Sequence, residues 1–391
     1  MRIIIDVQGM QTQSRLRGIG RYTLSLTESI IKNRGEHEII LALNGMFPET
    51  ISPIQLAFEG LLPKENIKVW NAQGPVSECF VENTWRNEAA EFIRESFLES
   101  LNPDFILVTT LFEGFDDNFV MSLGHGSNDI ATAVVLYDLI PLMNKEKYLG
   151  SPSAIAWYQN KISHFKRSRI VLAISESARR EGIRYLDFSE DDIFNISTAS
   201  SDEFKKIELS PSEQSKIRLK FGLSKNYLMY SGATDERKNH LALIASYAAL
   251  PPSVRSHHQL AFIGGLPADH QRAFADHAKK CGLAEGELVI SGRVSDHELI
   301  CLYNLCKAFI FPSWHEGFGL PALEAMKCGR AVIASNTSSL PEVVGKLDAL
   351  FDPFDQESIT KKIEQVLTDA SFRKALEQHS IEQAKTFTWD K

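Results

Sequence analysis

Short hydrophobic runs alternate with segments of helical pattern along the whole chain. In the first half the runs are Arg2–Asp6, Glu38–Leu43, Phe105–Thr109, Ala133–Tyr137 and Ile170–Ile174. In the second half they are Tyr227–Ser231, Gln259–Ile263, Leu288–Ser291, Ala308–Phe311 and Ala331–Ala334. Continuous apolar runs of this length are typical of buried parallel strands joined by helical crossovers. The pattern therefore predicts an α/β architecture.

A polar stretch between the two series of runs indicates a domain boundary. Glu203–Ser215 is polar and contains Ser210-Pro211-Ser212, so we expect a linker there. A chain of 391 residues is also longer than a single core usually grows. We therefore predict two doubly wound domains, residues 1–205 and 206–391. Ligands of such sheets bind beyond the carboxyl ends of the strands, so we expect the ligand in the cleft between the domains.

Composition excludes several classes of protein. Hydrophobic residues make up 43% of the chain and charged residues 24%, which is ordinary for a soluble globular protein. The net charge of -8 argues against nucleic acid as a partner. The 5 cysteines are odd in number and form no CxxC pair, so we expect neither a disulfide framework nor a zinc site. Reduced thiols favour a cytoplasmic location.

The segment with the strongest chemical signal is Phe311–Met326, in which a strand leads into a glycine-rich turn and then a helix. Gly317 and Gly319 let backbone amides approach a ligand closely. Pro321 suits the first helical turn, where its missing N–H costs nothing. The free amides and the positive end of the helix dipole favour a bound diphosphate.

Two carboxylates bracket this turn. Glu316 precedes it, in reach of a transferred sugar, and Glu324 follows about one turn into the helix, where it can accept hydrogen bonds from vicinal hydroxyls such as those of a ribose. Either carboxylate alone is often structural. Two of them around one Gly-x-Gly-x-Pro turn favour a binding role.

A second segment, Tyr230–His240, follows the first strand of the second half and precedes a helical stretch, Leu241–Leu250. It places Arg237 and Lys238 at the carboxyl end of a strand, where they can neutralise charge on a leaving diphosphate. The alternative is a solvated cluster of charges in a loop.

Two segments of the first half carry weaker signals. Gly18 and Gly20 open a helix after the first strand and permit close backbone approach, although a plain turn has the same pattern. Residue 23 is Thr23, so no GxGxxG is complete, which argues against a dinucleotide cofactor. Tyr137 and Asp138 end an apolar strand, and Asp138 fits either a catalytic or acceptor-contacting role or a turn.

Together, these segments resemble the retaining glycosyltransferases of family four over nearly the whole chain. The most specific part is Glu316 through Glu324, which looks like the E-x7-E element of that family. Gly292–Leu299 is similar to the segment whose backbone holds the nucleotide base, and Arg237-Lys238-Asn239 to the diphosphate-binding element. Gly18-Ile19-Gly20 is similar to the glycine loop of the N-terminal domain.

The resemblance implies a GT-B fold, with two Rossmann-like doubly wound domains facing a central cleft, and a division of roles. Glu316 and Asp138 are the expected catalytic residues, and Tyr137 the expected acceptor contact. The expected donor contacts are Gly18, Gly20, Arg237, Lys238, Val294, Gly317, Phe318, Gly319, Leu320 and Glu324.

Two departures from the family pattern bear on mechanism. The family usually has His-Asp where this chain has Tyr137-Asp138, and many members have Gly-Arg where it has Gly232-Ala233. The second departure leaves Arg237 and Lys238 as the main cationic pair. The resemblance implies transfer with stereochemical retention, no metal and no cofactor, with departure and attack on one face of an oxocarbenium-like sugar.

Within the family, Arg17–Tyr22 and Tyr137–Pro141 look most like the bacterial mannosyltransferases that build polymannose O-antigens. This likeness implies GDP-mannose as donor and a lipid-linked α-mannose chain as acceptor. It also implies a cytoplasmic protein, peripheral at the inner membrane and held by a partner there. Some such enzymes carry two modules, and Phe387–Lys391 reads like the start of a helix, so a second transferase module beyond Lys391 is one expectation and a frayed chain end is the alternative.

Several alternatives stay open. They are transfer of another hexose from a UDP-sugar, a GT-B epimerase or phosphorylase, an NAD-dependent dehydrogenase, and a non-catalytic scaffold. A small basic and aromatic segment, His164–Arg169, could contact a membrane, but a solvated helix face is the favoured interpretation.

Overall fold

The structure is a computed structural model that describes residues 1–16, 18–126 and 130–390. The chain forms two compact units, Met1–Thr198 with the residues from Trp389 onward, and Ala199–Thr388. They are called the first and second unit below. The polar linker predicted at Glu203–Ser215 is partly wrong, because helix α8 begins at Pro211. Ser210 caps that helix, and Glu213 completes a capping box with it.

The first unit contains a parallel sheet of 7 strands in the order β3-β2-β1-β4-β5-β6-β7. The strands are β1 (Arg2–Asp6), β2 (Glu38–Asn44), β3 (Ile67–Trp70), β4 (Phe105–Val108), β5 (Ala131–Leu136), β6 (Ile170–Ala173) and β7 (Ile193–Asn195). The helices are α1 (Gly18–Lys32), α2 (Pro48–Ala57), α3 (Thr84–Ser100), α4 (Ile140–Met143), α5 (Lys145–Tyr148), α6 (Pro152–Phe165) and α7 (Glu176–Leu186). The hydrophobic pattern predicted five of these strands and missed β3 and β7, which are short and lie toward the two edges.

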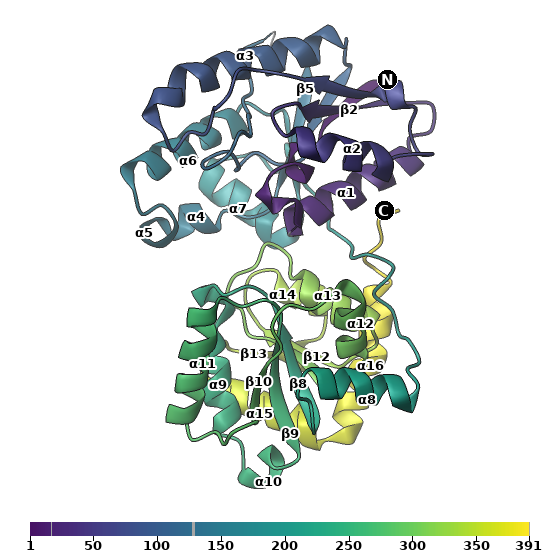
Figure 1. The fold of residues 1–391 in the computed structure, drawn as a ribbon, viewed down its shortest axis with the longest axis vertical. Coiled ribbons are helices and arrows are strands. Elements are labelled where there is room, and N and C mark those ends of the chain that lie inside the picture. The colour runs from purple at the N-terminus through teal and green to yellow at the C-terminus, as the bar shows by residue number, and fades with distance from the viewer. Residues whose placement is uncertain (17, 127–129, 391) are drawn as a thin grey trace. The chain divides into compact units, whose positions relative to one another are not determined.

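The second unit contains a parallel sheet of 6 strands in the order β10-β9-β8-β11-β12-β13. The strands are β8 (Asn226–Ser231), β9 (His258–Ile263), β10 (Leu288–Ile290), β11 (Ala308–Phe311), β12 (Val332–Ser335) and β13 (Leu350–Phe351). The helices are α8 (Pro211–Lys220), α9 (His240–Ala248), α10 (Pro252–Arg255), α11 (Ala268–Lys280), α12 (Asp296–Leu305), α13 (Leu320–Lys327), α14 (Leu340–Val344), α15 (Gln356–Thr368) and α16 (Ala370–Ala384). Figure 1 shows α9 and α11 on one side of this sheet and α8, α12 and α16 on the other.

The strand order of the second unit determines which loops meet. β8 lies between β9 and β11, with Ala308 paired to Leu228 and Phe309 to Met229. The strand order reverses at this point, and open α/β sheets bind ligands where it does. The loops that follow β8 and β11 therefore leave the same edge of the sheet side by side.

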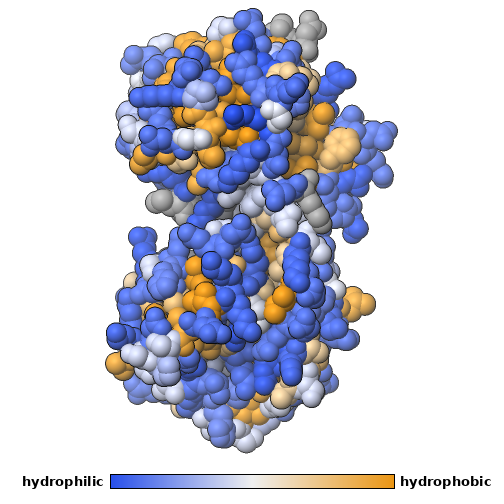
Figure 2. Space-filling view, turned by 90° about the vertical axis from the view of Figure 1, so that its right-hand side faces the viewer, coloured by the Kyte–Doolittle hydropathy of each residue, from blue (hydrophilic) through white to orange (hydrophobic). Residues whose placement is uncertain are grey.

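The last described residues return to the first unit, where they pack on α1 (Figure 1). The ring centroids of Trp389 and Tyr22 are 5.3 Å apart, and the hydroxyl of Ser29 donates a hydrogen bond to the Trp389 carbonyl. On the face in Figure 2, hydrophobic side chains lie in separate groups among hydrophilic ones. Within the described ranges, none of the helices has the length and hydrophobicity that crossing a bilayer requires.

Candidate functional site

Two loops at the carboxyl ends of β8 and β11 carry the charged residues Arg237, Lys238 and Glu316, which the sequence predicts as site residues. Arg237 and Lys238 lie in a single 3-10 turn, Glu236–Lys238, which Asp235 caps by accepting a hydrogen bond from the Arg237 N–H. Glu316 lies in the loop between β11 and α13. The Trp314 N–H donates to the Arg237 carbonyl over 2.9 Å, which ties the two loops together.

The structure brings Glu316 between the two predicted cations. Arg237 Nη1 donates to Glu316 Oε2 over 2.9 Å, and Lys238 Nζ donates to Glu316 Oε1 over 2.5 Å. The Lys238 ammonium also lies 5.3 Å from the centroid of the Phe311 ring. The sequence predicted all three residues as site residues but not their pairing. Because they pair with one another, the alternative interpretation, a cluster of charges surrounded by solvent, does not describe them.

The cluster of Arg237, Lys238 and Glu316 is largely buried but keeps some contact with solvent. The side chains of Glu316 and Lys238 are each 9% exposed, and that of Arg237 is 20% exposed. Burial raises the pKa of the Glu316 carboxyl, but the two cations outweigh that effect and hold its pKa below the usual value. Glu316 is therefore ionised at neutral pH, and the three side chains carry a compensated charge at the edge of the sheet.

Serine side chains from the next loop fix the backbone of Glu316. Ser338 accepts a hydrogen bond from the Glu316 N–H over 3.0 Å. The hydroxyls of Ser338 and Ser339 both donate to the Glu316 carbonyl, over 2.6 Å and 2.9 Å. Ser338 has φ 57°, a left-handed conformation uncommon outside glycine and asparagine. Nothing in the local sequence distinguishes this pair from other serines, and sequence reasoning missed it.

The glycine turn that follows Glu316 has the predicted form. Gly319 has φ 111° at the N-cap of α13, and a Cβ there would lie 2.6 Å from Leu340 Cδ2. Only glycine fits both constraints. Pro321 occupies the first turn of α13, as predicted. Phe318 is buried, with its ring centroid 5.5 Å from that of Phe387, so its backbone rather than its side chain borders the turn.

Glu324 is held by a residue that the sequence did not suggest. It lies in α13, and its Oε2 accepts a hydrogen bond of 3.0 Å from the hydroxyl of Tyr303 in α12. Burial raises the pKa of the Tyr303 phenol, and the adjacent carboxylate raises it further, so the phenol remains a donor. Tyr303 therefore orients the carboxylate at the predicted ribose position.

Glycines line the ends of the strands next to these loops. Gly232, Gly264 and Gly292 follow β8, β9 and β10, and all have positive φ, at 156°, 134° and 72°. Gly264 and Gly292 form an isolated antiparallel bridge. The predicted base-binding residue Val294 is half-buried just beyond it, next to the cap of α12. The Gly264-Gly265 pair directly after the run Gln259–Ile263 was the sequence signal that could have identified this corner.

In the first unit, α1 begins at Gly18 as predicted, but Gly18 and Gly20 differ. A Cβ on Gly20 would lie 2.3 Å from the Cα of Arg15, whereas a Cβ on Gly18 would meet nothing within 4 Å. Packing alone thus requires a glycine at position 20. Packing does not require one at position 18, and a role for either glycine in donor binding stays a prediction.

Tyr137 and Asp138 follow β5, also as predicted. The hydroxyl of Tyr137 donates to the Thr109 carbonyl over 3.0 Å, and its ring meets the ring of Tyr22 edge-on at 5.3 Å. Asp138 Oδ1 accepts from the Ile140 N–H over 3.1 Å at the start of α4. Both residues thus have local structural partners. Their acceptor and catalytic roles stay predictions.

Comparison with known proteins covers both units. Residues 212–383 match the family model of glycosyl transferases, group 1. The whole chain is 38% identical over 390 residues to a serotype-specific mannosyltransferase WbdA of Escherichia coli. It spans 46% of the length of that relative. It is also 35% identical over 238 residues to O-antigen chain mannosyltransferase B of Escherichia coli, with 60% of this chain and 61% of the relative covered.

Solved structures of other proteins have a similar fold at low sequence identity. A sucrose-phosphate synthase from Thermosynechococcus elongatus has a TM-score of 0.71 at 17% identity, covering 100% of this chain and 96% of that one. Anabaena HepE in complex with UDP and glucose has a TM-score of 0.68 at 17% identity, covering 99% and 95%. The predicted GT-B fold with two Rossmann-like units is confirmed.

Proposed function

The chain carries a domain of the group 1 glycosyl transferases, and on that premise we propose that it is a retaining α-mannosyltransferase that uses GDP-mannose. The acceptor in this proposal is a lipid-linked O-antigen polysaccharide. The observation that carries the transferase activity is the cluster of Arg237, Lys238 and Glu316 at the carboxyl ends of β8 and β11.

The charges of the cluster suit a nucleoside diphosphate. The charges of Arg237 and Lys238 are balanced by Glu316 and Asp235 next to the N-terminus of α13, whose dipole favours an anion. A diphosphate entering this corner draws the guanidinium and the ammonium toward its oxygens. The Glu316 carboxylate is then released toward the hydroxyls of the sugar attached to that diphosphate.

The same groups act more strongly as the sugar departs. Breaking the bond between sugar and phosphate adds negative charge to the leaving diphosphate, and in this proposal Arg237 and Lys238 neutralise that charge. Because Glu316 is ionised and fixed by Ser338 and Ser339, it can also hold a sugar whose ring gains positive character. Tyr303 holds Glu324 ready for the vicinal hydroxyls of the ribose.

The relatives support mannose as the sugar and an O-antigen chain as the acceptor. The WbdA relatives and O-antigen chain mannosyltransferase B are named as mannosyltransferases. GDP-mannose is proposed because it is the nucleotide donor implied by the resemblance to polymannose enzymes. A peripheral position at the cytoplasmic face of the membrane, a partner there and a second transferase module belong to the same proposal.

The test is transfer to a short mannose oligosaccharide from GDP-mannose, UDP-glucose, UDP-galactose or UDP-N-acetylglucosamine. We expect product with GDP-mannose and loss of product in Glu316→Ala, with an unchanged circular dichroism spectrum. Glu357→Ala is the matched control, because Glu357 also pairs with a lysine, Lys361, but on an exposed surface. Transfer only from a UDP-sugar would refute the GDP-mannose assignment, and normal turnover of Glu316→Ala would refute the role of the cluster.

A further inference from the structure

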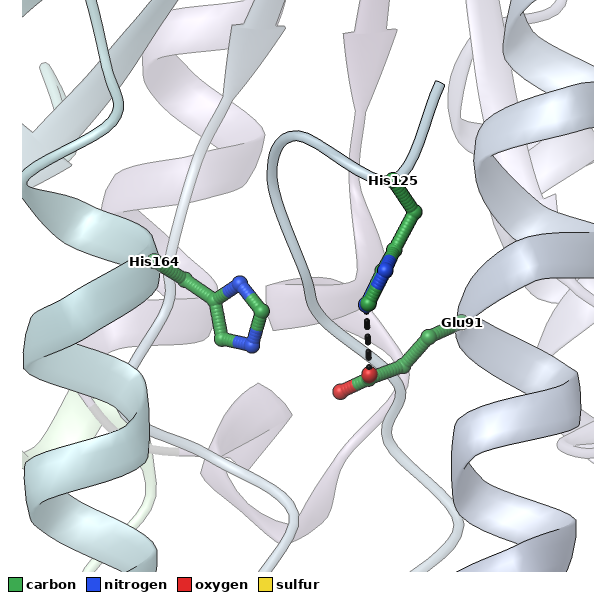
Figure 3. Close-up of side chains that lie close together, drawn as sticks. All are labelled: Glu91, His125 and His164. Carbon is green, nitrogen blue, oxygen red and sulfur yellow. Dashed lines mark hydrogen bonds and ion pairs between the residues drawn. The ribbon is translucent and has the colours of Figure 1, made fainter.

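Three potential metal ligands meet in the first unit, whereas the loops after β8 and β11 belong to the second unit. Glu91 comes from α3, His164 from α6, and His125 from the loop between β4 and β5. Each offers one ligand atom, and these three atoms all lie within 4.8 Å of one another. Figure 3 shows the two imidazole rings and the carboxylate directed toward a common space.

Glu91 has an unused oxygen in this space. The residue is 3% exposed, and its Oε2 lies 3.0 Å from His125 Nε2. Its Oε1 is buried and has no hydrogen-bond partner among the residues the structure describes. Burial of an unpartnered carboxylate oxygen is costly, and burial accordingly raises the pKa of Glu91. A bound cation would remove that cost.

His164 presents the second ligand in a suitable state. Burial lowers the pKa of its imidazole to about 4, so the ring is neutral at neutral pH. Its Nδ1 lies 3.2 Å from the Leu123 carbonyl and 3.1 Å from the Leu123 N–H. In the tautomer that donates to the carbonyl, the lone pair of Nε2 is available to a metal, an arrangement common among histidine ligands. Sequence reasoning had placed His164 on a solvated helix face, which is wrong because the residue is 4% exposed.

We propose that Glu91, His125 and His164 form a zinc site that stabilises the first unit. Two imidazoles and one carboxylate are a ligand set that Zn²⁺ accepts, with a water in the fourth position. In a tetrahedral site with bonds of about 2.0–2.2 Å, two ligand atoms lie about 3.3–3.6 Å apart, so the ligand atoms, now within 4.8 Å of one another, close in by at most about 1.5 Å. His125 can make this movement because its side chain is 23% exposed and comes from a loop.

The surrounding charges permit a divalent cation. Lys161 is a buried cation whose charge acts on Glu91, and its ammonium is already bound to Glu78 over 2.6 Å and to the Met121 carbonyl over 3.1 Å. Glu78 thus compensates Lys161, and the Glu91 carboxylate is left to compensate the metal. An ion bound here would join α3, α6 and the loop of His125, which are distant in sequence, and its binding energy would add to folding stability.

The experiment uses the full chain, freed of metal by chelation and buffer exchange, and titrates it with zinc sulfate by calorimetry. We expect one tight site per chain, and a rise in Tm of roughly 5 °C at a hundredfold excess over the Kd. Glu91→Gln and His164→Gln should each weaken zinc binding at least about tenfold and abolish the rise in Tm. Because each rise is measured against the same metal-free variant, a variant with lower stability still gives a valid result.

Two histidine–cysteine pairs provide the control for adventitious zinc. His277 and Cys281, like His297 and Cys301, lie with Nε2 and Sγ 3.6 Å apart. The double variant His277→Gln/His297→Gln should keep the tight site. Cobalt(II) should show visible absorption without a thiolate-to-cobalt band. Loss of zinc binding in the double variant, a thiolate band, or equal affinity in Glu91→Gln and the parent protein would each overturn the proposal.

Discussion

Both sheets place a buried carboxylate at the carboxyl end of a central strand, with very different surroundings. In the first unit, Asp6 at the end of β1 accepts from Arg94 Nε over 2.7 Å and from the N–H and amide of Gln8. Both side chains of this ion pair are 0% exposed. In the second unit, Glu316 accepts from Arg237 and Lys238, whose side chains keep 20% and 9% of their surface exposed.

The difference separates an ion pair that the protein encloses completely from a cluster that solvent can still reach. Asp6 accepts hydrogen bonds from protein donors, and neither it nor Arg94 has any surface exposed to solvent, so we expect this ion pair to serve the fold. The cations of Glu316 border glycine turns and retain access to solvent, so an anion can replace the carboxylate as their partner. Burial and charge alone do not separate the two clusters. The two clusters differ in the access of solvent to the cations and in the glycine turns that border them.

The largest effect is expected when the fully buried ion pair of Asp6 and Arg94 is broken. Asp6→Asn leaves the buried Arg94 guanidinium without a counter-charge and should lower the free energy of unfolding by about 3–5 kcal/mol. Activity per folded molecule should stay unchanged. Urea unfolding measures this, with Glu38→Gln as control, because Glu38 pairs with Arg2 at the same 2.7 Å on the surface. A decrease of less than 1 kcal/mol in the free energy of unfolding would mean that the ion pair of Asp6 and Arg94 does not have the inferred structural role.

The next largest effect is expected in the partly exposed cluster of Arg237, Lys238 and Glu316. Lys238→Ala and Arg237→Ala should each lower kcat about 100-fold, because leaving-group charge grows in the transition state. The KM for the uncharged acceptor should change little, and the Tm should fall less than in Asp6→Asn. Steady-state kinetics with both substrates decides, and a loss confined to acceptor binding would contradict the assignment of these cations.

A smaller effect should follow at the neighbouring carboxylate. Glu324→Ala should weaken donor binding about tenfold or more through lost ribose contacts, and Tyr303→Phe several-fold, because only the orientation of Glu324 is lost. Both variants should raise the donor KM more than they lower kcat. Donor titration by calorimetry tests this, and full affinity in Glu324→Ala would refute the ribose assignment.

The smallest effect sharpens the idea of exchange at Glu316. Glu316→Gln removes the charge that competes for Arg237 and Lys238 while it keeps the side-chain shape. GDP, which lacks the sugar, should therefore bind about two- to fivefold more tightly, the order expected for partly exposed ion pairs. Calorimetry with GDP and the two proteins measures the ratio. Weaker binding would mean that the carboxylate organises the cations instead of competing with the phosphates.

Local sequence patterns predicted much of the fold and the backbone of the site. Ten of the strands follow from hydrophobic runs, and the turn at Gly319 and Pro321 follows from residues whose backbone preferences are their own. The strands β3, β7 and β13 were missed because Lys68 interrupts the apolar run of β3, and because β7 and β13 contain only two apolar residues each. The predicted linker failed at Pro211 because a Ser-Pro pair fits a helix start as well as a turn.

By itself, the sequence determined the alternation of strands and helices, the two series of strands and the positions of the glycine turns, because these depend on neighbouring residues and on backbone conformation. Only the tertiary structure decided which residues distant in sequence pair at the proposed sites. Glu316 meets Lys238 across 78 residues, Tyr303 meets Glu324 across 21, and His125 meets Glu91 across 34. Such pairs depend on which strands lie side by side and which helices pack together, and no local pattern specifies that order.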